Sequence, residues 1–456
     1  MNALNEFYWL TVLLLPLAAL AQKPKDLSEL YDKGTLEYWH TRYPISTQRI
    51  FNEGMLPVFN VAEKRVLANI DLQFPLRPTG EYYGDPLALY AGGNTVTMPI
   101  SSLKFFDDLC VAYAWLWAND YSLETVNDYV AMLKYSDPEK FSGGRYPQPL
   151  KALHIPENAL QNPKVDELAL RFFNSARAFM LAHELGHIYH RHPGYGPNVT
   201  KEQARENETE ADEFALDIMR RAATIPMGMG LFFQATACWL PNRWDFESEE
   251  AWEAYQDTST HPLNADRLES LAIMLNEADD DFTPGRKGNP ADREIIRFIA
   301  MGIADVAQWL KDLDLQHSMV ISALETTPAA LAPRHRGERS APPTAANKPE
   351  RKALPAFQGT YVGKYIRYVG SDQEDLSIRV IFQRSGERVT GQYNFGLGVG
   401  TIRGTIRNNT LYFEWQWGGT YGRGTMQATE QGRAFSGKWG YRESSDNGGE
   451  WSGRRQ

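Results

Sequence analysis

Cysteine is scarce in this sequence, which has only Cys110 and Cys238 among its 456 residues. Two cysteines cannot build a disulfide-stapled scaffold or a cysteine-type zinc site. Both lie in apolar stretches, so one disulfide and two buried thiols are equally compatible with the sequence. A chain of this length must be stabilised mainly by hydrophobic cores, and it is long enough for more than one domain.

Positive charge is also in short supply. The chain has 47 Lys and Arg against 57 Asp and Glu, a formal net charge of -10. It contains no stripe of Lys and Arg interleaved with aromatic residues, which a protein needs to follow a phosphate backbone. We therefore expect no nucleic-acid partner.

Long apolar runs are missing as well. The run from Trp9 to Ala21 is shorter than the ~20 residues of a membrane helix, and no later run is longer than that limit. It ends in Ala-Leu-Ala, which is typical of a signal-peptidase site, so we predict a signal peptide at residues 1–21 and an exported protein, periplasmic or secreted. An amphipathic or mis-started N-terminus is the alternative, because residues 1–8 contain no Lys or Arg.

The rest of the chain divides by composition. Residues 22–324 are predicted to form one α+β domain, mainly helical, with a strand at Thr95–Ile100 and an apolar helix at Leu103–Trp117. Residues 325–355 are rich in Pro, Ala and charge and are predicted to be a flexible linker.

Residues 356–456 have a different composition, rich in Gly, aromatic and β-branched residues in short alternating runs. This pattern predicts a separate all-β module, an antiparallel sheet or barrel of roughly six to eight strands. Its aromatic residues form either a core or a ligand-stacking face, and we favour the core. The sequence does not identify a ligand for this module. The residues concerned are Tyr412, Phe413, Trp415, Trp417, Trp439 and Trp451.

The motif that carries chemistry is H-E-L-G-H at residues 183–187, within a helical pattern from about Val165 to Arg191. Histidines four residues apart lie on one face of a helix, so His183 and His187 can bind the same cation. Glu184 lies beside them, where it can act as a base on a metal-bound water. A surface helix with incidental histidines is the alternative.

Two histidines do not complete a catalytic zinc site, so a third ligand is required. The metzincin spacing fails because His190 and Pro193 occupy the positions where that class has Gly and His. A second predicted helix, from about Lys201 to Ala223, carries Glu208 and Asp212 one turn apart, and Glu210 faces elsewhere as the fallback ligand. An acidic helix start without a metal is the alternative.

These motifs, with a third one downstream, resemble those of a known family. H-E-L-G-H is followed by E-x-E-A-D-x-x-A at residues 208–215 and by Thr260-His261-Pro262, four residues and Arg267-Leu268. This order is similar to that of the gluzincin metallopeptidases related to HtpX and the type I CAAX prenyl proteases. The resemblance covers roughly residues 90–275. It does not extend to that family's membrane helices or prenylated substrates.

The resemblance implies a role for each matching residue. Zn2+ would be held by His183, His187 and Glu208, with Glu184 as general base. Asp212 would support the ligands, His261 would approach the oxyanion and Arg267 would brace the ligand carboxylates. The family's edge strand above the zinc corresponds weakly to Ala91–Met98. About 65 residues separate this segment from the zinc helix, which implies an insertion.

We therefore predict a zinc-dependent metalloendopeptidase that acts on a protein or peptide substrate. Two other functions remain open: a zinc-stabilised binding protein without catalysis, and a zinc hydrolase of a non-peptide bond. His190 and His192 are interpreted as favourable charges at a helix C-terminus. A role of His190 in supporting the ligands or contacting the substrate is the alternative.

Overall fold

The computed structural model describes residues 26–193, 199–258, 263–278, 281–283, 289–335, 356–369, 372–394, 399–417, 420–429, 432–442 and 444–455. The chain divides into two compact units, Met1–Arg339 and Ser340–Gln456, and each has its own buried apolar cluster. The first unit is mainly helical and the second is an antiparallel β-barrel, which confirms the predicted fold class. The predicted signal peptide, residues 1–21, lies outside the described residues.

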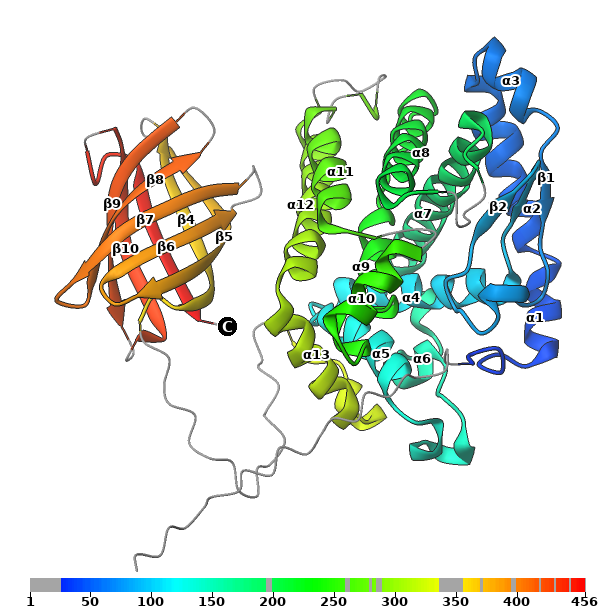
Figure 1. Cartoon of the computed structure of the whole chain (residues 1–456), viewed down its shortest axis with the longest axis horizontal. Helices are drawn as coiled ribbons and strands as arrows, with labels where there is room; N and C mark the ends of the chain where they lie inside the picture. Colours follow the sequence, from blue (N-terminus) through cyan, green and yellow to red (C-terminus); the bar gives the residue numbers. More distant parts are fainter. Residues whose placement is uncertain are drawn as a thin grey trace, which may run out of the picture. The chain divides into compact units, whose positions relative to one another are not determined.

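Figure 1 follows the helices of the first unit from blue to yellow-green. They are α1 (Lys33–His40), α2 (Tyr43–Arg49), α3 (Val61–Leu67), α4 (Ile100–Ala118), α5 (Glu124–Tyr135), α6 (Pro149–Ala152), α7 (Pro163–His190), α8 (Lys201–Arg221), α9 (Met229–Trp239), α10 (Glu249–Thr258), α11 (Ala265–Glu277), α12 (Pro290–Lys311) and α13 (Leu313–Glu325). No helix among the described residues is both long enough and apolar enough to cross a membrane.

A small sheet accompanies these helices. Its strands are β1 (Asp71–Gln73), β2 (Tyr90–Gly92) and β3 (Thr95–Thr97), in the order β1-β3-β2. The strand predicted at Thr95–Ile100 is therefore present but shorter, because α4 begins at Ile100 directly after Pro99. Strand β2 is an edge strand of this described sheet and packs against α7.

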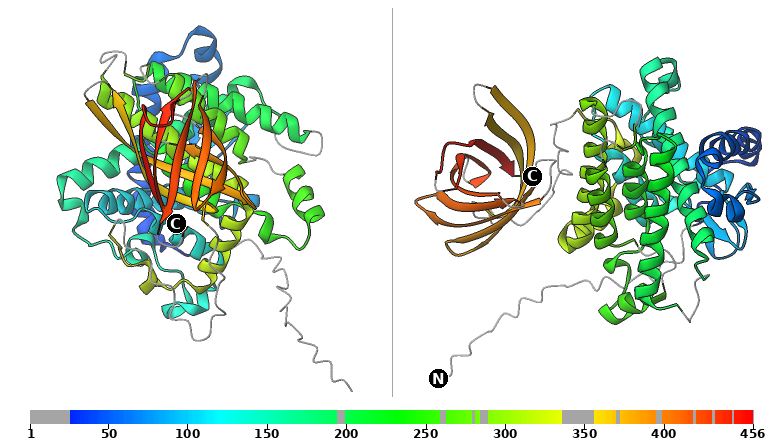
Figure 2. Two further views of the ribbon diagram at one scale, coloured as in Figure 1. Left: turned by 90° about the vertical axis from the view of Figure 1, so that its left-hand side faces the viewer. Right: turned by 90° about the horizontal axis from the view of Figure 1, so that it is seen from above.

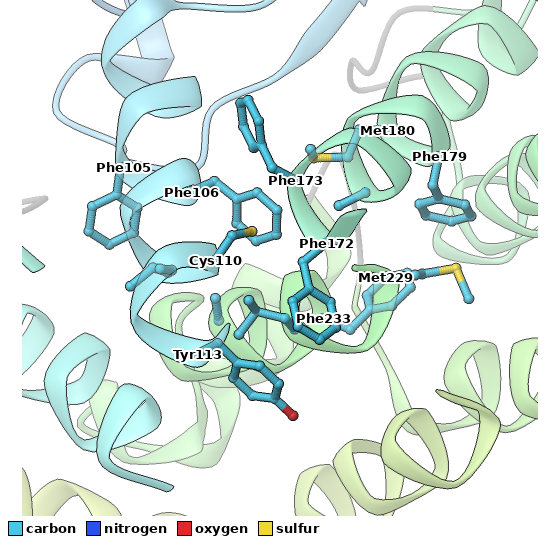
Figure 3. Packing of buried hydrophobic residues seen from close by; sticks show 14 of the residues in the cluster. Phe105, Phe106, Cys110, Tyr113, Phe172, Phe173, Phe179, Met180, Met229 and Phe233 are labelled. Atoms are coloured by element: carbon cyan, nitrogen blue, oxygen red, sulfur yellow. The ribbon is translucent and has the colours of Figure 1, made fainter. Parts of the chain in front are cut away.

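The main core lies where α4 meets α7. Helix α4 is apolar around most of its circumference and is therefore buried on most sides. Phe106 of α4 lies 6.5 Å from Phe173 of α7, and Tyr113 meets Phe172 edge to face at 5.3 Å between ring centroids. Figure 3 shows Cys110 among these rings. This core holds the helix of the H-E-L-G-H motif rigidly in place.

Neither cysteine forms a disulfide. Cys110 and Cys238 are both buried as free thiols, which decides between the two alternatives that the sequence left open. Burial raises the pKa of both thiols, so they remain protonated.

Helices α7 and α8 lie side by side, with α11 and α12 beyond α8 (Figures 1 and 2). Helix α7 starts at Pro163, where Asn162 accepts a hydrogen bond from the first turn. It ends because Arg191 adopts a left-handed conformation, with φ of 57°. The helices approach closely at Gly186, since a Cβ atom there would lie 2.9 Å from Cα of Ala211.

The helical unit extends further along the chain than composition suggests. Residues 326–335 belong to the predicted linker, yet Leu331 is 1% exposed and Arg334 forms an ion pair with Asp128 at 3.0 Å. The ring of His335 stacks on Tyr121 with centroids 4.5 Å apart. These contacts hold the segment on α5 and the turn before it, despite its Pro and Ala content. Residues 336–355, the rest of the predicted linker, lie outside the described residues.

The second unit is a closed barrel in which every pair of neighbouring strands is antiparallel. Strand order around the barrel follows the chain. The strands are β4 (Gly359–Val369), β5 (Asp372–Ser385), β6 (Arg388–Asn394), β7 (Val399–Arg407), β8 (Thr410–Trp417), β9 (Thr420–Thr429), β10 (Ala434–Tyr441) and β11 (Gly449–Arg455).

Aromatic side chains fill the barrel interior. Phe413, Trp415, Trp439 and Trp451 are all 5% exposed or less, which confirms the preferred prediction of a core. Tyr412 differs, at 53% exposed, because it points outward between its two buried neighbours. Trp417 has no described side-chain environment.

Glycine makes this aromatic core possible. In Gly437-Lys438-Trp439 the glycine and the tryptophan share one face of β10, and a Cβ atom at Gly437 would lie 1.9 Å from the carbonyl oxygen of Thr425. The strands can therefore approach each other only with glycine at that position.

Candidate metal centre

Three predicted ligands converge in the helical unit. His183 and His187 come from α7, and Glu208 comes from α8. Their ligand atoms all lie within 4.8 Å of one another: the two Nε2 atoms are 3.1 Å apart, and they lie 3.5 and 3.4 Å from the Glu208 oxygens. All three side chains are buried. This group can bind a metal ion, because it gathers two imidazole nitrogens and a carboxylate around one point.

Asp212 and Arg267 contact the ligand side chains and support them. Asp212 is one turn after Glu208 on α8, and its Oδ1 lies 2.8 Å from Nδ1 of His183. Arg267, on α11, contacts Asp212 at 2.6 Å and Glu208 at 2.5 Å. The two supporting roles predicted from the sequence thus correspond to direct contacts. These ion pairs of Arg267 link helix α11 to helix α8.

The electrostatics of this network favour charged side chains. Burial alone lowers the pKa of His183, but hydrogen bonds and ion pairs with Asp212 and Glu208 outweigh it and raise the pKa to about 10. Burial raises the pKa of Asp212, but Arg267 and His183 outweigh it, so that the pKa falls below its ordinary value. Asp212 is therefore a carboxylate that can hold the Nδ1 proton of His183 and leave Nε2 directed at the metal position.

His187 has an analogous partner that the sequence analysis missed. Its Nδ1 lies 2.8 Å from Nδ1 of His192, whose Nε2 lies 2.9 Å from a Glu210 oxygen. When Nε2 of His187 serves a metal, its proton is on Nδ1 and is donated to His192, which in turn donates to Glu210. The interpretation of His192 as a simple helix-end charge was therefore wrong. Glu210, the fallback ligand, belongs to this chain of contacts instead.

The turn at the end of α7 explains the contact between His187 and His192. Because Arg191 is left-handed, the chain reverses and the N–H of His192 donates to the carbonyl of His187 at 3.0 Å. A glycine at this position would have predicted a left-handed turn from the sequence, but an arginine does not. His190 lies beside His192 and Glu210, and the partial loss of solvent around its ring lowers the pKa of His190.

Glu184 lies with the ligands on the wall of one cavity. The cavity has a volume of about 310 Å³, and its lining includes His183, Glu184 and Glu208. Glu184 is itself 6% exposed. Its carboxylate therefore reaches the same small space as the metal ligands, as the motif predicts for a base.

Much of the remaining cavity wall comes from segments that the sequence analysis left without a role. Helix α9 contributes Phe232, Phe233 and Trp239, and the segment before β2 contributes Asp85 and Leu87. The apolar character of α9 was visible in the sequence, but its partner was not.

His261 and its neighbours Thr260 and Pro262 lie outside the described residues, so the role of His261 stays a prediction.

Comparison with known proteins gives one match. The model of the family described as Peptidase U49, a metallopeptidase family, matches residues 123–285. No curated protein and no solved structure matches the chain. The matched segment includes α7, α8 and α11, and with them every ligand and supporting residue predicted above. The match and the buried His-His-Glu group together support a metallopeptidase, whose substrate is a protein.

Proposed function

We propose that this protein is a zinc metalloendopeptidase of the gluzincin type. The observation that carries the proposal is the convergence of His183, His187 and Glu208, beside a cavity that His183, Glu208 and Glu184 line. A structural zinc site is normally closed by a fourth protein ligand and does not need a further carboxylate beside it. Three protein ligands and an adjacent base are the composition of a catalytic site.

Zinc is the metal that this donor set favours. Two ligands at the usual zinc distance of ~2.1 Å and at tetrahedral angles lie roughly 3.4 Å apart. The three distances here are 3.1, 3.4 and 3.5 Å. When bound, zinc would polarise the scissile carbonyl and make water more acidic. Nδ1 contacts with Asp212 and His192 fix both imidazoles in the orientation that this role requires.

In this proposal Glu184 moves the proton. Its carboxylate takes a proton from the attacking water and delivers it to the amine nitrogen that leaves. His261 would donate to the oxyanion of the tetrahedral intermediate, a role carried over from the sequence motif alone. Arg267 has a different task, since its contacts with Asp212 and Glu208 hold the ligand carboxylates in place.

The substrate would bind as an extended strand. Strand β2 is an edge strand of the small sheet and packs on α7, and the residues just before it line the cavity. An edge strand offers unpaired N–H and C=O groups to which a peptide can add. Such a substrate must be unfolded or flexible near the bond that is cut.

The test combines metal analysis with proteolysis of casein for wild type, Glu184→Gln and Glu208→Ala. We expect about one zinc per chain in wild type and in Glu184→Gln, with cleavage only by wild type. Loss of the base should reduce cleavage by a factor of about 10² to 10⁴. Glu208→Ala should lose both zinc and cleavage. Glu206→Ala serves as the matched control, because Glu206 is an exposed glutamate of α8 outside these contacts, and it should keep zinc.

Other outcomes would support the alternative functions. Zinc in all variants without cleavage of any peptide would favour a binding protein or a hydrolase of another bond. Absence of zinc from purified wild type, after dialysis against zinc salts, would overturn the metal site itself.

A further inference from the structure

The lining of the active-site cavity includes a carboxylate, Asp85, that has no countercharge among the described residues. Asp85 lines the same cavity as His183 and Glu184. Its Oδ1 accepts a hydrogen bond from the N–H of Leu87 at 2.9 Å, and its side chain is also hydrogen-bonded by that of Trp239. No described Lys, Arg or His forms an ion pair with it. A poorly solvated carboxylate with two neutral donors is costly unless a cation joins it.

The path from the metal ligands to Asp85 follows helix α9. Phe233 packs on Phe179 at 5.8 Å, and Phe179 lies 6.2 Å from His183, so this part of α9 is next to the metal position. Trp239, six residues further along α9, is bonded to Asp85. Six helical residues span about 9 Å. Asp85 is therefore too far away to take part in hydrolysis, but within reach of a long side chain of the substrate.

The wall of the cavity suits an aliphatic stem with a charged head. Leu87, Leu89 and Leu240 supply apolar surface, and the rings of Tyr82 and Tyr255 also line the cavity. Lys and Arg bury their methylene stems on such surfaces and direct the charged head to a polar partner. Aromatic rings near that head add cation–π attraction.

We infer that Asp85 forms the floor of a substrate subsite for a basic side chain, Lys or Arg, of a residue that flanks the scissile bond. This inference rests on the proposed peptidase function. It assigns a specificity to a cavity whose other walls are mostly apolar. The cation of the substrate would form the ion pair that Asp85 lacks among the described residues.

Asp85 could instead serve only to fix its own loop through Leu87 and Trp239. Asp85→Asn separates the two roles, because its amide oxygen can still accept the hydrogen bond from Leu87 but the side chain carries no charge. The matched control is Asp128→Asn, which removes a carboxylate that is paired with Arg334 outside the cavity.

The first experiment is digestion of unfolded casein at pH 7.5, with every cut identified by mass spectrometry. Wild type and Asp128→Asn should cut with Lys or Arg enriched at one position beside the bond. Asp85→Asn should still cut, but the preference for a basic residue over Met should fall about ten- to a hundredfold. An unchanged preference in Asp85→Asn, or none in wild type, would overturn the inference.

The second experiment needs no turnover. Thermal unfolding is followed with n-butylguanidinium, a mimic of the Arg side chain, and with the neutral N-butylurea as its control. The cation should raise the Tm of wild type relative to that of Asp85→Asn, and the urea should not distinguish them. Equal responses of both proteins to the cation would contradict the subsite.

The two experiments separate failure of the subsite from failure of the proposed function. Cation binding that depends on Asp85, without any cleavage, would keep the subsite and refute the peptidase. Cleavage without basic preference or cation binding would keep the peptidase and refute the subsite.

Discussion

Asp85 also determines how stability should respond to pH at the scale of a single residue. Burial raises the pKa of Asp85 to about 6, from an ordinary value of 3.8. The folded state therefore holds this proton more tightly than the unfolded chain. The protonated carboxyl group therefore adds to the free energy of unfolding. This stabilisation is complete below about pH 4 and is lost as the pH rises through about 6.

The consequence can be measured with Asp85→Asn. We expect the variant to equal wild type in stability near pH 4 and to exceed it at pH 7.5. At about 1.4 kcal/mol per pKa unit, the gain is at most about 3 kcal/mol. Urea unfolding at the two pH values measures it. A variant that is destabilised equally at both would mean that the hydrogen bonds to Leu87 and Trp239, rather than the charge, dominate.

Single residues of the site were predictable where helical spacing determines them. His183 and His187 share a face by their separation of four, and Glu208 and Asp212 do so for the same reason. His192 was not predictable, because its contact depends on a left-handed turn at Arg191, a residue type that rarely adopts one. The acceptor of a ligand histidine can therefore be placed by backbone geometry that composition does not reveal.

At the scale of elements, the crossing of α7 and α8 brings the ligands together. Gly186→Ala would introduce a Cβ atom 2.9 Å from the backbone of Ala211, three residues after Glu208. Overpacking costs about 1–3 kcal/mol, and the better helix propensity of Ala returns about 1. We expect a net loss of up to about 2 kcal/mol in urea unfolding, with zinc affinity reduced about tenfold or more.

Gly230→Ala is the matched control for this prediction. Gly230 lies in α9, and a Cβ atom there would meet nothing within 4 Å. The substitution should leave zinc affinity unchanged and stability equal or higher by up to about 1 kcal/mol. If Gly186→Ala behaved in the same way, the close approach of α7 and α8 would not be what positions Glu208.

Elements were predicted well where the hydrophobic periodicity extends over many residues. They were predicted less well where they depend on contacts between residues that are far apart in the sequence. The predicted helix from Val165 to Arg191 is α7 to within two residues, because its apolar face and Pro163 mark it. Residues 326–335 were predicted to be linker, since Pro and Ala cannot reveal that Leu331 finds a buried position. The edge-strand segment Ala91–Met98 is a short hairpin, formed by most of β2 and by β3.

At the scale of the whole molecule, the two units have separate cores and should behave as separate domains. We expect residues 22–339 and 340–456, produced as two chains, each to fold with a cooperative thermal transition. The first should bind zinc and cut casein at the rate of the full chain. The second should bind no zinc. Calorimetry and the casein assay measure both.

Loss of cleavage in the isolated first unit, with its zinc retained, would contradict this independence and implicate the barrel in substrate capture. The division itself was visible in the sequence, because composition changes sharply after residue 355. Closure of the barrel was not, since it depends on pairing between the first strand, β4, and the last, β11, which alternation of residues alone cannot specify.

The two buried thiols have a consequence for where this protein can work. Cys110 and Cys238 contribute packing rather than a covalent bond, and burial keeps them in the unreactive thiol form. The fold therefore needs no oxidant, isomerase or glutathione balance to mature. It should reach the same native state in a reducing cytosol, in an oxidising periplasm or in the medium outside a cell.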